Sequence, residues 1–168
     1  MAGNGAAVKV HIDNVVKKFD TRKGEMTALN GVNLDIHENE FVCVVGPSGC
    51  GKSTLLNIIG GLEEPTSGSV TVDGKPVEGP GPDRGIVFQQ YALFPWLTVE
   101  ENVKFGLKLQ GKSKEECDEI ANKYIKLVEL QDFAKSYPKE LSGGMKQKLG
   151  LACALLGEPK LLILDEPR

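Results

Sequence analysis

The sequence predicts an α/β fold with an N-terminal antiparallel β layer, a parallel core sheet and a helical subdomain inserted into that core. Partial alternation of apolar and polar residues in VKVHIDNVV (8–16) and in residues 28–40 favours two strands with one exposed face. The runs FVCVVG (41–46) and LLIL (161–164) are continuously apolar, which is typical of strands buried on both faces of a parallel sheet. Helix formers become frequent after about residue 90, which indicates the inserted subdomain.

The elements between these strands follow from local signals. Leu55, Ile58, Ile59 and Leu62 have helical spacing directly after FVCVVG and its glycine loop. The sequence then predicts a strand and turn in SGSVTVDGKPV (67–77), and a further strand, RGIVFQQ, follows the Gly- and Pro-rich EGPGPD.

Two helices are expected in the C-terminal half. Ser113 and Glu116 form a capping box that opens the first. Its buried face is predicted to carry five residues: Cys117, Ile120, Ala121, Tyr124 and Val128. The second helix is predicted to begin near Gly144, with Gly157 and Pro159 as stop signals.

Composition argues against several classes of protein. The chain has 168 residues and a formal charge of −3, so a nucleic acid is not the expected partner. Cys43, Cys50, Cys117 and Cys153 form no CxxC pair and have no histidine nearby in sequence, which predicts reduced thiols and neither zinc nor disulfides. The N-terminus is no secretory signal, and the longest apolar stretch, 149–157, is shorter than the roughly 18 residues of a spanning helix.

The segment GPSGCGKST matches G-x-x-x-x-G-K-[ST] between a predicted strand and a predicted helix, the setting of a phosphate-binding P-loop. Its glycines let backbone N–H groups point inward at phosphate, and Lys52 is expected to reach the β and γ phosphates of a nucleotide. Ser53 should ligate Mg²⁺ and Thr54 should contact a further phosphate. The expected nucleotide-binding residues are Gly46, Pro47, Ser48, Gly49, Cys50, Gly51, Lys52, Ser53 and Thr54. The alternative is a glycine-rich turn with a solvated lysine.

The apolar run 161–164 ends in Asp165 and Glu166. In the sheet of a P-loop NTPase this strand runs parallel to FVCVVG, so its tip is expected on the same side as the phosphate loop. Asp165 is then predicted to hold a Mg²⁺-bound water, and Glu166 to orient or deprotonate the attacking water. A plain turn is the alternative for such an acidic pair.

LSGGMKQ, at 141–147, points to a particular family. Together with GPSGCGKST, VFQQ and LLILDEP, in this order and spacing, it resembles the ATP-binding cassette ATPases from about residue 8 to 167. The resemblance implies a RecA-like P-loop NTPase core. It also implies one partial nucleotide-binding domain over residues 1–168, with a core and β layer at about 1–90 and 158–168 and a helical subdomain at about 91–157.

The resemblance also assigns residues that spacing alone does not. Phe19 matches the aromatic that stacks on adenine, with core packing as the alternative. Gln89 matches the loop glutamine that contacts Mg²⁺ and the attacking water, and Gln90 is the less favoured candidate. Ser142, Gly143 and Gly144 match the signature that binds the γ phosphate held by a second ATPase subunit, a role compatible with helix capping by Ser142. These assignments imply a head-to-tail dimer with ATP and Mg²⁺ between its subunits.

The segments GPGPDRGIVFQQYALFPWLTVEENV and YPKELSGGM resemble the bacterial nitrate, sulfonate and taurine importer ATPases. This likeness implies ATP hydrolysis coupled to uptake of a small anion or organosulfur solute, with permease subunits and a solute-binding protein as partners and no nucleic acid. It also implies a cytoplasmic subunit held at the inner face of the membrane through the permease. Phe94, Pro95 and Trp96 suit docking of a permease helix, and packing of Trp96 within its own subdomain is the alternative.

The chain departs from the family pattern in two places. Lys146, Lys148 and Cys153 stand where the family usually has arginine. In the family, the strand that follows in sequence inserts between FVCVVG and LLILD. After DEP the family usually continues with a phenylalanine, an aspartate-bearing loop and, further on, a histidine that contacts the γ phosphate. Arg168 departs from this pattern, so the sequence is expected to be C-terminally truncated after its DEP motif, without the later strands. Without the inserting strand the chain is expected to be poorly stable on its own.

Two further hypotheses follow. The first is a truncated nucleotide-binding fragment that does not hydrolyse ATP. The second, less favoured, is a soluble cassette protein that acts on nucleic acid or ribosomes. P-loop kinases are excluded because LSGG has no place in them.

Overall fold

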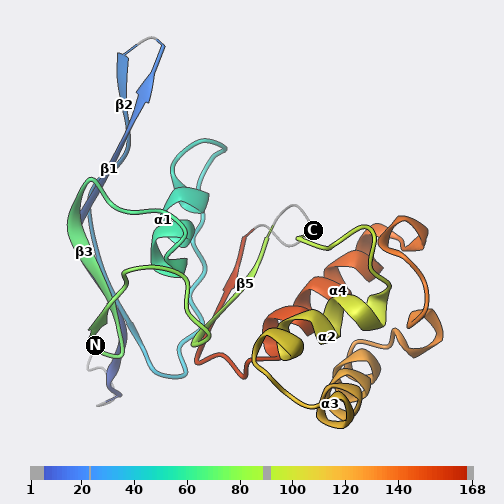
Figure 1. Cartoon of the computed structure of the whole chain (residues 1–168). Coiled ribbons are helices and arrows are strands. Elements are labelled where there is room, and N and C mark those ends of the chain that lie inside the picture. Colours follow the sequence, from blue (N-terminus) through green and yellow to red (C-terminus); the bar gives the residue numbers. More distant parts are fainter. Residues whose placement is uncertain (1–5, 23, 89–91, 166–168) are drawn as a thin grey trace. The chain divides into compact units, whose positions relative to one another are not determined.

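The computed structural model describes residues 6–22, 24–88 and 92–165 (Figure 1). The chain forms two compact units, Met1–Gly81 and Pro82–Arg168. The first unit ends at Gly81 in the sequence, whereas the boundaries of the helical subdomain were expected near residues 90 and 158. The expected division into a nucleotide-binding core and a helical subdomain remains a prediction.

The first unit is built on the predicted antiparallel layer. Its strands are β1 (Val8–Thr21), β2 (Gly24–His37), β3 (Ser67–Val72) and β4 (Lys75–Pro76). They form one sheet in the order β2-β1-β3-β4, with antiparallel pairing throughout. Ile12 of β1 pairs with Leu34 on one side and Val70 on the other. The two expected strands are therefore confirmed. β1 continues past its predicted end at residue 16 to Thr21, whereas β2 begins at Gly24, before its predicted start at 28, and ends at His37, short of its predicted end at 40.

One face of this sheet is buried. Val10 and Ile12 alternate with exposed residues, as a half-buried strand requires. The register shifts between Ile12 and Val15, and Asn14 has a positive φ of 47°, so this bulge keeps Val15 buried as well. Helix α1 (Lys52–Gly60) adds its own buried residues to the unit: Leu55, Ile58 and Ile59. The helix predicted after the glycine loop is confirmed, and Gly61 ends it in a left-handed conformation.

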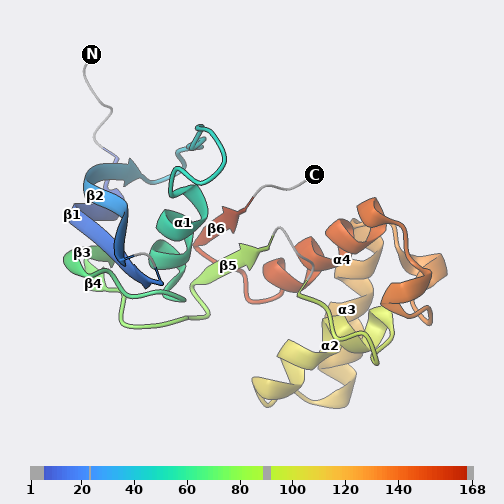
Figure 2. The same cartoon turned by 90° about the horizontal axis from the view of Figure 1, so that it is seen from above.

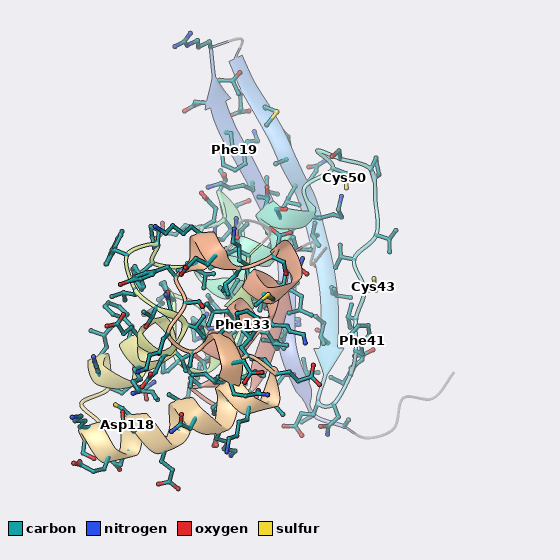
Figure 3. The ribbon with its side chains drawn as sticks, turned by 90° about the vertical axis from the view of Figure 1, so that its right-hand side faces the viewer. Phe19, Phe41, Cys43, Cys50, Asp118 and Phe133 are labelled. Atoms are coloured by element: carbon teal, nitrogen blue, oxygen red, sulfur yellow. The ribbon has the colours of Figure 1, made fainter. Side chains whose placement is uncertain are left out.

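The strand predicted for FVCVVG is wrong. Residues 41–47 have no regular structure, and Phe41 and Val45 are 89% and 87% exposed. Figure 3 shows Phe41 and Cys43 on this irregular segment. An apolar run becomes a buried strand only where neighbouring strands bond its backbone. Within the part of the chain that the structure describes, no strand pairs with residues 41–47.

The second unit is mainly helical (Figure 2). It contains α2 (Val99–Leu109), α3 (Lys114–Leu127), α4 (Gly143–Leu155) and the short 3₁₀ turns η1 (Gln131–Phe133) and η2 (Pro138–Glu140). The predicted capping box of Ser113 and Glu116 is present, with the Glu116 carboxylate accepting from the Ser113 N–H at 2.9 Å. Both predicted helices are thus confirmed.

The three helices of this unit share an apolar core. Its fully or nearly buried members are Val99, Val103, Ala121, Tyr124, Ile125, Val128, Leu130, Leu141, Leu149 and Ala152. Of the face predicted for α3, Ile120 is only partly buried and packs against this cluster, whereas Cys117 is 2% exposed. Among the described residues no helix is both long and apolar enough to cross a membrane.

Strands β5 (Arg84–Val87) and β6 (Leu161–Leu164) form a parallel pair beside the end of α4. A Cβ at Gly85 would lie 2.8 Å from the Ala154 carbonyl oxygen, so glycine permits this close approach. Ile163 is buried, but Leu162 and Leu164 are 38% and 39% exposed. The expectation that this strand is buried on both faces is therefore wrong, since β5 is its one hydrogen-bonded neighbour among the described strands.

Candidate functional site

The loop before α1 turns sharply at two glycines. Gly49 and Gly51 have φ values of 79° and 96°, in the left-handed region that glycine adopts without strain. The Cys50 N–H donates to the Pro47 carbonyl oxygen at 3.3 Å and closes the turn. A Cβ at Gly51 would lie 2.6 Å from the carbonyl oxygen of Ala28 in β2, so the loop also needs glycine for packing.

The N-terminus of α1 has no side-chain cap. Gly51 is the N-cap residue and supplies no side-chain acceptor, and the first turn contains no acidic residue. In contrast, α2 and α3 each begin with a capping box and two acidic residues. The first N–H groups of α1 and the positive end of its dipole therefore favour a negatively charged ligand.

Lys52 lies across this loop. Its ammonium group donates to the carbonyl oxygens of Gly46 at 2.8 Å and Pro47 at 2.9 Å, and lies 3.8 Å from the Cys50 sulfur. Figure 3 shows Cys50 on the same loop. The Lys52 ammonium is thus held at the loop whose sequence pattern predicts phosphate binding. The flexible side chain of lysine allows this group to exchange its carbonyl partners for phosphate oxygens.

Phe19 lies in β1 and is half-buried, outside the buried core of its unit (Figure 3). The Lys17 ammonium is 5.0 Å from the ring centroid, at cation–π distance. Lys17 is itself held by the Glu63 carboxylate at 2.5 Å and the Glu64 carbonyl oxygen at 2.8 Å. The contact with adenine stays a prediction.

Asp165 follows directly on β6. Val87 and Leu164 are register partners at the ends of their parallel strands, and the Asp165 N–H donates to the Val87 carbonyl oxygen at 3.0 Å. Because parallel strands end at the same edge of a sheet, Asp165 lies at the edge where β5 also ends. The predicted catalytic residues Gln89 and Glu166 lie outside the described residues, as does Gln90.

The signature segment begins α4. The Ser142 hydroxyl accepts from the Met145 N–H at 3.3 Å, so the predicted helix cap is formed. Ser142, Gly143 and Gly144 are all exposed. A Cβ at Gly144 would meet no atom within 4 Å, which leaves the backbone of this helix start accessible to a ligand. The structure therefore supports both the cap and the accessibility that the predicted phosphate contact requires.

A family model for the ABC transporter matches residues 29–168, more than four fifths of the chain. The chain belongs to the ABC transporter family. The nitrate import ATP-binding protein NrtD of Synechocystis sp. is 52% identical over 94% of this chain and 59% of its own length. The taurine import ATP-binding protein TauB of Burkholderia thailandensis is 49% identical over 89% of this chain and 57% of its own length. The chain thus spans less than three fifths of these two curated relatives.

Among solved structures, the ABC family fold is matched by the ATP-binding cassette MJ0796 in a dimeric, post-hydrolysis state bound to ADP and Pi. The TM-score is 0.87 at 40% sequence identity, and the match covers 94% of this chain and 74% of that one. This agreement confirms the P-loop NTPase fold predicted from the sequence motifs.

The departures from the family's arginine pattern have local partners in the structure. Lys148 donates to the Glu129 carboxylate at 2.8 Å, and this bond lowers the pKa of Glu129. Cys153 packs against the helical core, where burial raises its pKa to about 12 and keeps the thiol neutral. Cys153 therefore fits the packing of α4, whereas Lys148 makes a surface ion pair.

Sequence reasoning missed the capping box of Thr98 and Glu101 and the buried side chain of Asn102. The box was readable as T-x-x-E in TVEE, directly before an amphipathic helix. Asn102 carried no such signal, because its partners lie in the chain before α2 and become visible only in the fold.

Proposed function

We propose that this chain supplies the ATP-binding part of an ABC importer, binding MgATP at residues 46–54 and hydrolysing it in a head-to-tail dimer. The observation that carries the proposal is the glycine loop held against β2, with the Lys52 ammonium across it and the uncapped N-terminus of α1 behind it. This combination brings backbone donors, the positive end of a helix dipole and the Lys52 ammonium together in a single loop.

Nucleotide phosphates would occupy the loop. The N–H groups of Gly49, Gly51 and the first turn of α1 would donate to the phosphate oxygens. Lys52 would leave the carbonyl oxygens of Gly46 and Pro47 and move to the β and γ phosphates. The hydroxyl groups of Ser53 and Thr54, in the first turn of α1, would complete the set. The remaining loop residues, Pro47, Ser48 and Cys50, would contribute through the backbone.

The donor set also fits Mg²⁺, which prefers oxygen ligands. Ser53 offers a hydroxyl oxygen, Asp165 a carboxylate and Gln89 an amide oxygen. The ion, when bound, would neutralise charge on the β and γ phosphates. Glu166 would then orient or deprotonate the attacking water, and Gln89 would help to position it.

Dimerisation would complete the site. The exposed Ser142, Gly143 and Gly144 at the start of α4 would bind the γ phosphate held by the second subunit. Phe19 would stack on the adenine through its ring. The dimeric state described for the MJ0796 cassette supports this arrangement.

Coupling to transport would pass through residues 94–96. Trp96 is 69% exposed, which favours its docking role over packing within its own unit. A permease helix docked there would place the subunit at the inner face of the membrane. Similarity to NrtD and TauB supports a small anion or organosulfur solute, delivered to the permease by a solute-binding protein.

Binding of a fluorescent ATP analogue tests the phosphate loop. Lys52→Ala removes a charged hydrogen-bond donor, and we expect the affinity to fall by about 10- to 150-fold, corresponding to roughly 1.5–3 kcal/mol. Lys75→Ala, at an exposed lysine of the same unit, is the matched control and should bind like the unchanged chain. Equal affinity of the two variants would refute the proposal.

A second function is favoured by one observation. The segment leading into the P-loop, residues 41–47, is irregular, and Phe41 and Val45 are highly exposed, which favours a chain that binds nucleotide without holding it for hydrolysis. This alternative expects nucleotide binding without steady hydrolysis. Sustained ATP hydrolysis by the 168-residue chain that is lost in Glu166→Gln would exclude it.

A further inference from the structure

Asn102 on α2 is a polar side chain in an apolar setting. It is only 5% exposed and lies next to Val103, which is fully buried in the helical core. A buried amide is tolerated where its donors and acceptor are bonded, and otherwise costs stability. Its hydrogen bonds therefore show what the residue does.

All of the Asn102 side-chain bonds go to the segment immediately before α2. Its Oδ1 accepts from the Phe94 N–H at 2.8 Å. Its Nδ2 donates to the carbonyl oxygens of Phe94 at 3.2 Å, Leu97 at 3.0 Å and Thr98 at 2.9 Å. One side chain thus holds both ends of residues 94–98, which we call the aromatic loop.

The aromatic loop presents the proposed docking surface. The Phe94 ring lies 4.5 Å from the Phe105 ring and 5.6 Å from the Trp96 ring, between centroids. Trp96 lies between the two ends of the loop that Asn102 bonds, and its ring is largely exposed. Asn102 therefore bonds the backbone on both sides of the exposed ring.

The same helix start is bonded to the chain that leads to the signature. The Val99 N–H donates to the Ser136 carbonyl oxygen and the Glu100 N–H to the Ala134 carbonyl oxygen, both at 2.9 Å. Residues 134–136 continue directly into η2 and then into Ser142, the N-cap of α4. Hydrogen bonds therefore connect the aromatic loop, the start of α2 and the segment before the signature.

We infer that Asn102 is a positioning residue for coupling: it fixes the aromatic loop to α2 so that a nucleotide-dependent movement at the signature is transmitted to the docked permease. The inference rests on the proposed function, because it assumes that the aromatic loop meets the permease. It adds a residue that touches neither nucleotide nor partner and acts through the backbone of Phe94, Leu97 and Thr98.

The loop itself is tested first, on the chain without a permease. In Asn102→Ala the Phe94 amide loses its acceptor, so its hydrogen exchange should accelerate by about fivefold or more relative to amides in α3. Trp96 is the single tryptophan of the sequence, and its fluorescence anisotropy should fall. Asn122→Ala, at an exposed asparagine of α3, is the matched control and should change neither signal.

Coupling is tested in the subunit assembled with its permease in lipid vesicles. We expect Asn102→Ala to lower the ratio of permease-stimulated to basal ATP hydrolysis by about fivefold or more, with the subunit still bound to the permease. Asn122→Ala should keep the ratio. The inference would be overturned if Asn102→Ala made the aromatic loop more mobile but left the hydrolysis ratio unchanged. It would also be overturned if the aromatic loop of this variant stayed as rigid as in the unchanged chain.

Asn102→Ser provides a second variant if the alanine variant does not fold. Its hydroxyl keeps a small neutral polar group at this position but is too short to bond Phe94, Leu97 and Thr98 together, and the same two outcomes apply. Failure of the proposed function gives a different result: Trp96→Ala would keep full binding to the permease, or Lys52→Ala would keep ATP binding. Neither of those results involves the mobility of the aromatic loop.

Discussion

Replacing Gly51 by alanine tests whether the phosphate loop depends on one backbone conformation and one close packing contact. Gly51 has a φ of 96°, and the added Cβ would lie 2.6 Å from the Ala28 carbonyl oxygen and 2.8 Å from the Leu29 Cδ2 atom. The left-handed backbone costs an alanine roughly 1–2 kcal/mol. Relief of the contact with a backbone oxygen adds about 1–3 kcal/mol, because α1 or β2 has to move.

The variant Gly74→Ala is a control that measures the backbone contribution without the steric one. Its φ is 73°, and an added Cβ would meet no atom within 4 Å, so Gly74→Ala carries backbone strain without the steric contact. We expect Gly51→Ala to lower the free energy of unfolding of its unit by about 2–5 kcal/mol, and Gly74→Ala by about 1–2 kcal/mol.

Both variants are measured by urea unfolding and by titration with a fluorescent ATP analogue. Displacement of the loop should lower the affinity of Gly51→Ala at least about tenfold, equivalent to roughly 1.4 kcal/mol, whereas Gly74→Ala should bind normally. Equal losses of stability in the two variants, or normal nucleotide binding by Gly51→Ala, would refute the reasoning.

Three further predictions follow from the described residues. Val45→Ser should change the free energy of unfolding by less than about 0.5 kcal/mol because Val45 is 87% exposed, whereas Ile58→Ala should cost about 2–5 kcal/mol, as measured by urea unfolding. The hydrogen bond between His11 and Asp35 raises the pKa of His11, with a smaller contribution from the nearby Asp13 charge. The His11–Asp35 pair therefore stabilises the β1–β2 hairpin at pH values below the unfolded-state pKa of the histidine. This stabilisation is lost as the pH rises through the raised, folded-state pKa. An NMR titration of His11 should show the higher midpoint, and Asp35→Asn should lower it. Ser142→Ala removes the cap of α4 and should cost about 1 kcal/mol of thermal stability in the helical unit.

Each of these expectations can fail in a definite way. A loss of more than about 1 kcal/mol in Val45→Ser would mean that residues 41–47 are packed, contrary to the structure. An unchanged His11 midpoint in Asp35→Asn would remove the cross-strand bond as the cause of the raised pKa. For Ser142, Ser69→Ala in β3 is a control outside any helix cap, and equal thermal shifts in the two variants would argue against the capping bond.

Local signals in the sequence were sufficient for most helices. The capping box of Ser113 and Glu116, the cap at Ser142 and the glycine before Lys52 all act within a few residues of the chain, so the sequence predicts their helices correctly. The glycine loop was equally readable, since its conformation follows from Gly49 and Gly51 themselves. Binding roles remain predictions for all of these residues.

Nonlocal pairing limited what the sequence could predict about strands. FVCVVG and LLIL have the same apolar character, yet Val45 is exposed and irregular whereas Ile163 is buried in a strand paired with β5. Hydropathy reports the preference of a segment to be buried, but the backbone partner that makes it a strand lies elsewhere in the chain. Among the described residues only the second segment has such a partner.

By itself, the sequence determined the family, the position of the phosphate loop and the starts of α1, α3 and α4, because each depends on residues close together in the chain. The tertiary structure decided that Lys52 bonds the Gly46 and Pro47 carbonyl oxygens, that Trp96 is exposed, and that Asn102 holds the aromatic loop. These features depend on which backbone groups folding brings within hydrogen-bond distance and which surfaces it leaves uncovered. That information is set by the packing of whole elements, and no single segment contains it.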